Sequence, residues 1–213
     1  QQAIDDAASD QGTVILPAET IEIDDTIDFF AQHSGVTLRG QGFNNHIRMA
    51  PNRSQDTSSI RIHYNDGPVR NVTIECLRVD GNMANQSKDQ VGQIVVEGSG
   101  TEFENILLRN LWLTGSFNGA YVSNTARLES ITAYNNEKHG VATDSGEGGW
   151  VEVEDYLAWG NGIYGIDTSM GKTRVRAFTV VNNGWGAKAT SETVIADYAN
   201  GLFKDNDEHG FTN

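Results

Sequence analysis

Four polar side chains in the second half of the chain have the chemistry needed to move a proton, namely those of Tyr121, His139, Asp167 and Lys188. An imidazole can act as a base near neutral pH and a phenol as an acid. A carboxylate or an ammonium group can orient these groups and balance the charge that develops. The four residues are too far apart in sequence for a local motif, so only a repeating fold could bring them together.

A repeat of this kind is present, because an asparagine stands four residues before a glycine at regular intervals. The pairs are Asn136 and Gly140, Asn161 and Gly165, Asn182 and Gly186, and Asn206 and Gly210. The glycines are 25, 21 and 24 residues apart, and Gly119 lies 21 residues before Gly140. Short β-rich segments such as LESITAYN and TRVRAFTVV separate them. This period predicts a parallel β-helix of about eight coils, stacked about 4.8 Å apart.

Each position of the repeat has an expected role. The asparagines should stack into a ladder that satisfies buried backbone groups at the corner of each coil. The glycine should permit a positive φ where the chain leaves the corner. The residue after the glycine is apolar and should point inward, which leaves the next residue pointing outward. The outward column is therefore predicted to contain Tyr121, Ala142, Asp167, Lys188 and Thr212.

A second column directly precedes the repeat glycines and contains His139, Tyr164, Trp185 and His209. These rings could form a stacking strip for sugars, or they could pack over the turn. Asp144 and Ser169 lie two residues beyond the outward column on their strands. The carboxylates of Asp144 and Asp167 could join a proton-transfer site, or they could hold Ca²⁺. His33, His46 and His63 lack metal-ligand spacing, and no protein metal site is predicted from them.

Composition limits the classes of partner. Asp and Glu number 29 against 15 Lys and Arg, which gives a net charge of −14. Such a surface repels nucleic acid and anionic membranes, and no apolar run is long enough for membrane insertion. An acidic, lysine-poor surface favours a halophilic source over an ordinary acidic secreted protein. The lone Cys76 is expected to be buried in the core.

The N-terminal sequence carries a resemblance to a known superfamily. GTVILPAETIEIDDTI and SGVTLRGQG, within residues 3–42, resemble the entry of pectin lyase-like right-handed parallel β-helices. Farther on, ITAYNNEKHGVATDS and DYLAWGNGIYG resemble coils of mannuronan C5-epimerases. The resemblance implies an all-β, single-stranded right-handed solenoid over residues 1–213. A capping helix is expected in residues 1–10, where the apolar residues have helical spacing.

The resemblance also implies an activity, namely lyase or epimerase chemistry next to the carboxylate of a uronate in an acidic polysaccharide. His139 matches the catalytic histidine of the epimerases. The D-P-H-E motif falls on IVVE at residues 94–97, two coils earlier, and retains only Glu97, or on YVSN at residues 121–124, one coil earlier, and retains none of its residues. Two functions therefore stay open. The first is an extracellular or cell-surface enzyme that acts on an acidic polysaccharide. The second is a non-catalytic adhesin, cell-envelope module or viral spike module that binds glycans or assembles through its open end.

The C-terminal end is expected to be uncapped, because residue 213 falls just after a corner of the repeat. An open end of a β-helix exposes unpaired strand edges. Further chain, or another copy in a homo-oligomer, is therefore expected to cover it.

Overall fold

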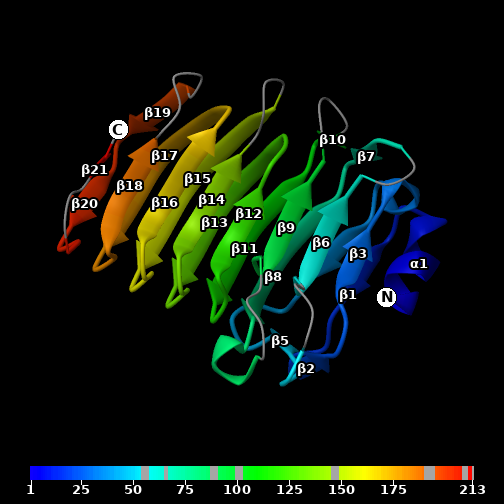
Figure 1. Ribbon diagram of the computed structural model, residues 1–213. Coiled ribbons are helices and arrows are strands. Elements are labelled where there is room, and N and C mark those ends of the chain that lie inside the picture. The colour runs from blue at the N-terminus through cyan, green and yellow to red at the C-terminus, as the bar shows by residue number, and fades with distance from the viewer. Residues whose placement is uncertain are drawn as a thin grey trace.

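The computed structural model describes the chain except residues 54–57, 65–66, 87–90, 99–102, 145–148, 190–194, 208–210 and 213, and it leaves out the side chains of residues 169, 170, 195, 196, 211 and 212. The strands follow one another around a single axis, and the colours of Figure 1 progress along that axis from the N-terminal to the C-terminal end. Every strand pairing in the described part of the chain is parallel.

Among the described residues, one sheet has eight strands, one from each coil, as the sequence predicts. In spatial order from the N-terminal end its strands are β3 (Ile27–Phe29), β6 (Ile60–His63), β9 (Ile94–Glu97), β12 (Asn118–Val122), β14 (His139–Asp144), β16 (Tyr164–Met170), β18 (Trp185–Ala189) and β21 (Phe211–Thr212). We call it the front sheet, because its strands face the viewer in Figure 1.

A second sheet covers the other side of the core and contains the longer strands. Its main path is β1 (Thr13–Ile15), β4 (Thr37–Arg39), β8 (Thr73–Asp80), β11 (Leu107–Thr114), β13 (Ala126–Tyr134), β15 (Trp150–Trp159), β17 (Lys172–Val181) and β19 (Ile195–Ala199). Strands β2 (Thr20–Ile23), β5 (His46–Met49) and β20 (Leu202–Lys204) pair beside this path. The short strands β7 (Val69–Arg70) and β10 (Phe103–Glu104) pair with each other. Two 3₁₀ turns, Ala31–His33 and Met83–Asn85, complete the elements.

The predicted N-terminal helix is present as α1 (Gln2–Ala8). It packs against β1 and the first 3₁₀ turn, and its buried Ile4 joins the core. The side chain of Asp5 lies 3.0 Å from Nε2 of the fully buried His33, which ties the helix to the first coil.

The inward positions of the repeat form the core, as predicted. Ala120, Val141, Ile166 and Ala187 follow the repeat glycines, and each is fully buried between the sheets. They stack in register on neighbouring front strands. A single coil has no second layer to cover these side chains, so the neighbouring coils and the opposite sheet must bury them together.

The asparagine ladder exists, with one correction to its membership. Nδ2 of Asn136 donates to Oδ1 of Asn161 at 2.9 Å, and Nδ2 of Asn161 donates to Oδ1 of Asn183 at 2.8 Å. Asn183 in turn donates to Asn206 at 3.2 Å. Asn182, predicted for the third position, is instead exposed and has a left-handed φ of 52°. This corner is one residue shorter, so the ladder position stands three residues before Gly186.

The expected role of the repeat glycines was also wrong. Gly119, Gly140 and Gly165 have no left-handed φ. A Cβ at Gly140 would instead overlap the hydroxyl of Tyr156 and the carbonyl oxygen of Gly165, and a Cβ at Gly119 would overlap the carbonyl oxygen of Gly140. Glycine is needed here because neighbouring coils approach too closely for a side chain.

A left-handed conformation recurs directly before the ladder asparagines, at Asn135, Gly160, Asn182 and Asp205, and again at a bend within the second sheet. The members of this bend are Cys76, Asn110, Ser130, Asp155, Ala177 and Asn200, with φ between 50° and 58°. Cys76 is therefore half-buried at an outward bend and is not the core residue that its type suggested. This column repeats a backbone conformation although its six members are of five different residue types.

Candidate proton-transfer site

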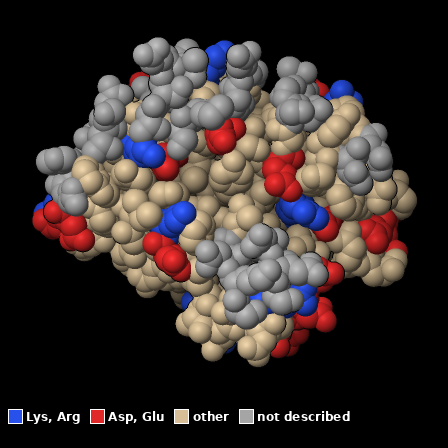
Figure 2. All heavy atoms as spheres, viewed as in Figure 1, with Lys and Arg blue, Asp and Glu red and all other residues tan. Residues whose placement is uncertain are grey.

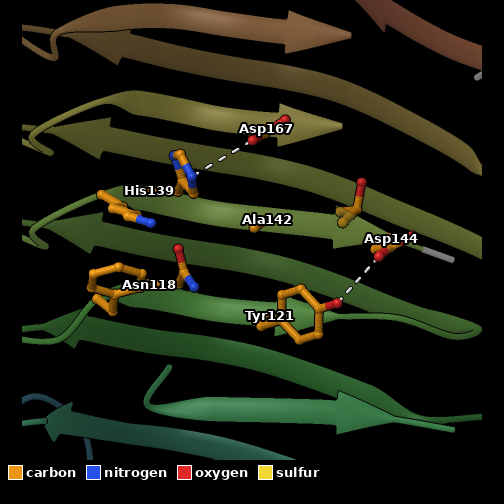
Figure 3. Close-up of a pocket in the computed structure, with 9 residues that line it drawn as sticks. Asn118, Tyr121, His139, Ala142, Asp144 and Asp167 are labelled. Carbon is orange, nitrogen blue, oxygen red and sulfur yellow. Dashed lines mark hydrogen bonds and ion pairs between the residues drawn. The ribbon is translucent and has the colours of Figure 1, made fainter. Parts of the chain in front are cut away.

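The predicted outward column lies on the front sheet. Tyr121, Ala142, Asp167 and Lys188 occupy directly paired positions on β12, β14, β16 and β18. Tyr121, Ala142 and Asp167 line a surface hollow of about 170 Å³, whereas Lys188, the fourth predicted member, is not among its lining residues (Figure 3). The hollow is lined by Phe117, Asn118, Tyr121, Lys138, His139, Ala142, Thr143, Asp144 and Asp167.

His139 begins β14, and Nε2 of its ring lies 3.6 Å from Oδ2 of Asp167 on the neighbouring strand (Figure 3). The Nδ1 atom is buried and has no hydrogen-bond partner among the described residues. Burial lowers the pKa of His139 to about 4, with the charge of Asp167 opposing this shift and the charges of Lys138 and Lys188 adding to it. The imidazole is therefore neutral near pH 7 and can accept a proton.

Tyr121 is the acidic counterpart on the preceding strand. Its hydroxyl donates to Oδ2 of Asp144 at 3.3 Å. Burial, together with the charge of Asp144, raises the pKa of Tyr121 to about 12. The phenol therefore keeps its proton near pH 7 while it lines the same hollow as His139.

Asp144 lies beside an irregularity in the sheet. The register between β14 and β16 shifts after Thr143, so that Asp144 pairs with Met170 and not with Ser169 as the repeat predicted. The residue spacing of the repeat cannot anticipate such a bulge, which inserts one residue in a single strand.

Asp167 is the most buried charged group of the site, with a side chain that is 8% exposed. Besides His139, it has Nζ of Lys188 within 3.8 Å. A buried carboxylate needs such partners to remain ionised. Asp167 on β16 thus lies between His139 on β14 and Lys188 on β18 and contacts both.

The aromatic column is formed by the residues that start these strands. The rings of His139 and Tyr164 are stacked with centroids 5.3 Å apart, and those of Tyr164 and Trp185 are 6.2 Å apart. Nζ of Lys188 lies 5.3 Å from the Tyr164 ring. His209, the fourth predicted member, lies outside the described residues. The rings thus contact one another along the axis, and their part in binding a substrate stays a prediction.

Glu97 ends β9 toward the N-terminal side of the hollow. Its carboxylate lies 3.7 Å from Nη1 of Arg61 and 3.7 Å from Nε2 of His63. Its charge contributes to the raised pKa of Tyr121, which places it electrostatically beside the site. Figure 2 shows this face with a mainly uncharged centre and separate acidic and basic groups around it.

Four lining residues, Phe117, Asn118, Lys138 and Thr143, were not predicted as parts of the site. Asn118 pairs directly with His139, so its place one coil before His139 in the aromatic column was a usable signal. Nζ of Lys138 lies 3.9 Å from the Phe117 ring, a contact between residues about one coil apart. The repeat gave the spacing for this contact, although neither residue type is repeated.

The acidic groups of the site do not form a metal centre within the described ranges. No group of three or more His, Cys, Asp or Glu side chains there is arranged to hold a metal ion. A Ca²⁺ role for Asp144 and Asp167 thus gains no support from the geometry. Likewise, none of the helices in the described part of the chain is long and apolar enough to cross a membrane.

Comparison with known proteins gives likenesses at the level of structure. No protein-family model and no curated protein sequence matches the chain. Among solved structures, the mannuronan C-5 epimerase AlgE4 A-module of Azotobacter vinelandii is similar with a TM-score of 0.62 and 18% identity, covering 97% of this chain and 73% of that one. The AlgE6 A-module of the same organism has a TM-score of 0.59 and 16% identity, covering 97% and 71%. The chain therefore has the pectin lyase-like right-handed parallel β-helix fold, which it shares with the A-modules of mannuronan C-5 epimerases.

Proposed function

We propose that this protein binds a uronate polymer across the front sheet and moves the proton next to the uronate carboxylate. The observation that supports this most is that a neutral imidazole and a protonated phenol line one hollow. A general base must be unprotonated and a general acid protonated at the working pH, and His139 and Tyr121 meet these conditions near pH 7.

His139 is the proposed base. Its ring lines the hollow and is neutral, so one of its two nitrogens carries the lone pair that takes the substrate proton. A bound carboxylate brings negative charge beside the imidazole and raises its proton affinity above that of the empty site. Asp167 then stabilises the imidazolium that forms, as a positioning residue.

Tyr121 is the proposed acid. When the C5–H bond breaks, its electron pair passes into the carboxylate as an enolate, which a nearby cation stabilises. Delivery of the Tyr121 proton to C5 from the opposite face of the ring would invert the configuration at that carbon, which is epimerisation. Delivery to the departing glycosidic oxygen would cleave the chain by β-elimination.

The substrate class is supported by the likeness in fold, by Lys138 in the lining of the hollow and by Lys188 next to Asp167. Both structural neighbours are named as epimerases of mannuronan. Uronate polysaccharides are found outside the cell, so we extend the proposal to an extracellular location. The net charge of −14 opposes an anionic polymer at long range, and salt should weaken this repulsion.

The test is hydrogen exchange in D₂O. The full chain is incubated with polymannuronate, polyguluronate or polygalacturonate at low and high salt. NMR then follows loss of the H5 signal, and ultraviolet absorbance follows unsaturated ends. We expect exchange with at least one polymer, and His139→Ala should slow it by roughly 10²–10⁴-fold.

His63→Ala is the matched control, because His63 is on the same sheet but does not line the hollow. It should leave the exchange rate within about twofold. Absence of exchange at every salt concentration, with polymer still bound and binding unchanged in His139→Ala, would reject catalysis in favour of a glycan-binding module.

A further inference from the structure

One end of the hollow contains a buried hydrogen-bond acceptor without a partner. Asn118 is 6% exposed, and its Oδ1 atom is buried and forms no hydrogen bond to any described residue. Most buried polar groups are paired, and an unpaired one costs about 1–3 kcal/mol. A residue that lines a surface hollow can recover this cost when a ligand supplies the donor.

The orientation of the Asn118 amide is fixed by its other end. Nδ2 donates to the backbone carbonyl of Val91 at 2.5 Å. Rotating the amide by 180° would place two carbonyl oxygens against each other, so the oxygen is the atom left for the hollow. The hollow therefore presents an acceptor at this point, which selects a ligand hydroxyl or another donor.

Lys138 provides the complementary charge at the same end. Its ammonium group lies 3.9 Å from the Phe117 ring, and it forms no ion pair within the described ranges. Lys188, in contrast, is 3.8 Å from the carboxylate of Asp167. A cation held on an aromatic face, without a carboxylate partner, is available to an anionic ligand.

We propose that Asn118 and Lys138 form a recognition subsite that reads a hydroxyl and a carboxylate of one sugar residue. Asn118 accepts a hydrogen bond from the hydroxyl, and Lys138 pairs with the carboxylate. Asn118 lies at one end of the hollow beside His139, whereas Tyr121 and Asp144 lie toward the other end, beyond Ala142 (Figure 3). This inference deepens the proposed function and rests on it for the class of sugar, but it concerns binding and not proton transfer.

The two contacts can be separated with a pair of probes that differ only in charge. β-1,4-Linked tetramannuronate carries both groups, whereas mannotetraose keeps the ring hydroxyls and has hydroxymethyl groups in place of the carboxylates. Binding of each probe to the full chain is measured by titration calorimetry or NMR. The variants are Asn118→Ala and Lys138→Met, and Lys204→Met, at an exposed lysine remote from the hollow, is the charge control.

The subsite predicts different patterns for the two variants. Asn118→Ala should weaken both probes by about 3- to 10-fold, because the lost hydrogen bond involves a neutral hydroxyl. Lys138→Met should weaken tetramannuronate by about 10-fold and mannotetraose by less than about twofold. Lys204→Met should change either affinity by less than about twofold. Thermal unfolding of each variant checks that the fold is retained.

Several results would overturn the subsite. Unchanged binding of both probes in a folded Asn118→Ala variant would do so, and so would equal effects of Lys138→Met and Lys204→Met. Failure of both probes to bind the unaltered chain at millimolar concentration would also reject it. Probes that bind in the predicted pattern, but without any hydrogen exchange, would support the subsite while rejecting the proposed catalysis.

Discussion

Two columns of the same solenoid differ in what they repeat. At the ladder corner, four successive coils present the same side chain, that of Asn136, Asn161, Asn183 and Asn206, in the same hydrogen-bonded arrangement. On the front sheet, four successive coils present a phenol, a methyl group, a carboxylate and an ammonium group at paired positions. Regularity therefore marks what the architecture needs, and variation marks where the surface is available for chemistry.

The largest effect on the regular part is expected from Gly140→Ala. The added Cβ would overlap the hydroxyl of Tyr156, which is held by a 2.6 Å bond to the carbonyl of Gly165. We expect the free energy of unfolding to fall by about 3 kcal/mol or more, measured by urea denaturation. Gly12→Ala is the control, since its Cβ would come no closer than 3.6 Å to a neighbour. Equal stability of the two variants would mean that close approach of the coils is not what requires glycine.

A somewhat smaller loss is expected when the ladder is interrupted. Asn161→Ala removes bonds to Asn183 and to the carbonyl of Ala133, and leaves the backbone N–H of Asn136 buried without its acceptor. We expect a loss of about 2 kcal/mol in unfolding free energy. Asn206→Ala, at the half-exposed end of the described ladder, should cost about 1 kcal/mol or less. An equal loss of unfolding free energy in Asn161→Ala and Asn206→Ala would contradict a ladder in which each inner asparagine bonds to both of its neighbours.

On the front sheet, we expect His139 to affect how the free energy of unfolding depends on pH. Burial lowers the pKa of His139 from 6.5 to about 4, so between these values the unfolded chain binds a proton that the folded chain does not. The stability that this group contributes is complete above about pH 6.5 and is lost as the pH falls toward 4. Comparing urea unfolding near pH 7 and pH 4.5, we expect the decrease to be roughly 1–2 kcal/mol smaller in His139→Gln. Identical pH dependence in the two proteins would show that His139 titrates normally.

The smallest effect is expected where only the backbone repeats. Ala177 has a φ of 50°, which strains a residue with a Cβ. Ala177→Gly should therefore raise the unfolding free energy by about 0.5–1 kcal/mol, since Ala177 is exposed and loses little packing. Ser9→Gly, at a right-handed position with φ of −60°, should show the opposite sign. A destabilised Ala177→Gly variant would contradict strain at this bend.

The fold could be predicted because the spacing of asparagine and glycine repeats along the chain. The role of an individual asparagine or glycine could not be predicted where two different structural requirements select the same residue type. Asn182 and Asn183 are adjacent, and a period that varies between 21 and 25 residues cannot choose between them. A glycine required for close approach looks the same in sequence as one required for positive φ. The left-handed bend escaped notice because Cys76, Ser130 and Ala177 share no residue type.

The site was predicted to the extent that it follows the repeat. Tyr121, His139 and Asp167 came from the periodic columns, and the structure places all three around one hollow. Asn118 and Lys138 occupy predictable places in the repeat, but the unpaired oxygen of Asn118 and the contact of Lys138 with an aromatic ring are visible only in the structure.

Ala142 has a consequence for how such proteins can diverge. It is the smallest side chain of the variable column, and it lies between Tyr121 and Asp167 in the paired strands. Exchange of this one methyl group for a larger or polar side chain would fill or reline the depression above it, while the coils beneath kept their stacking. Proteins with this fold could therefore change the shape and polarity of the hollow by a single substitution at this position, without a loss of stability.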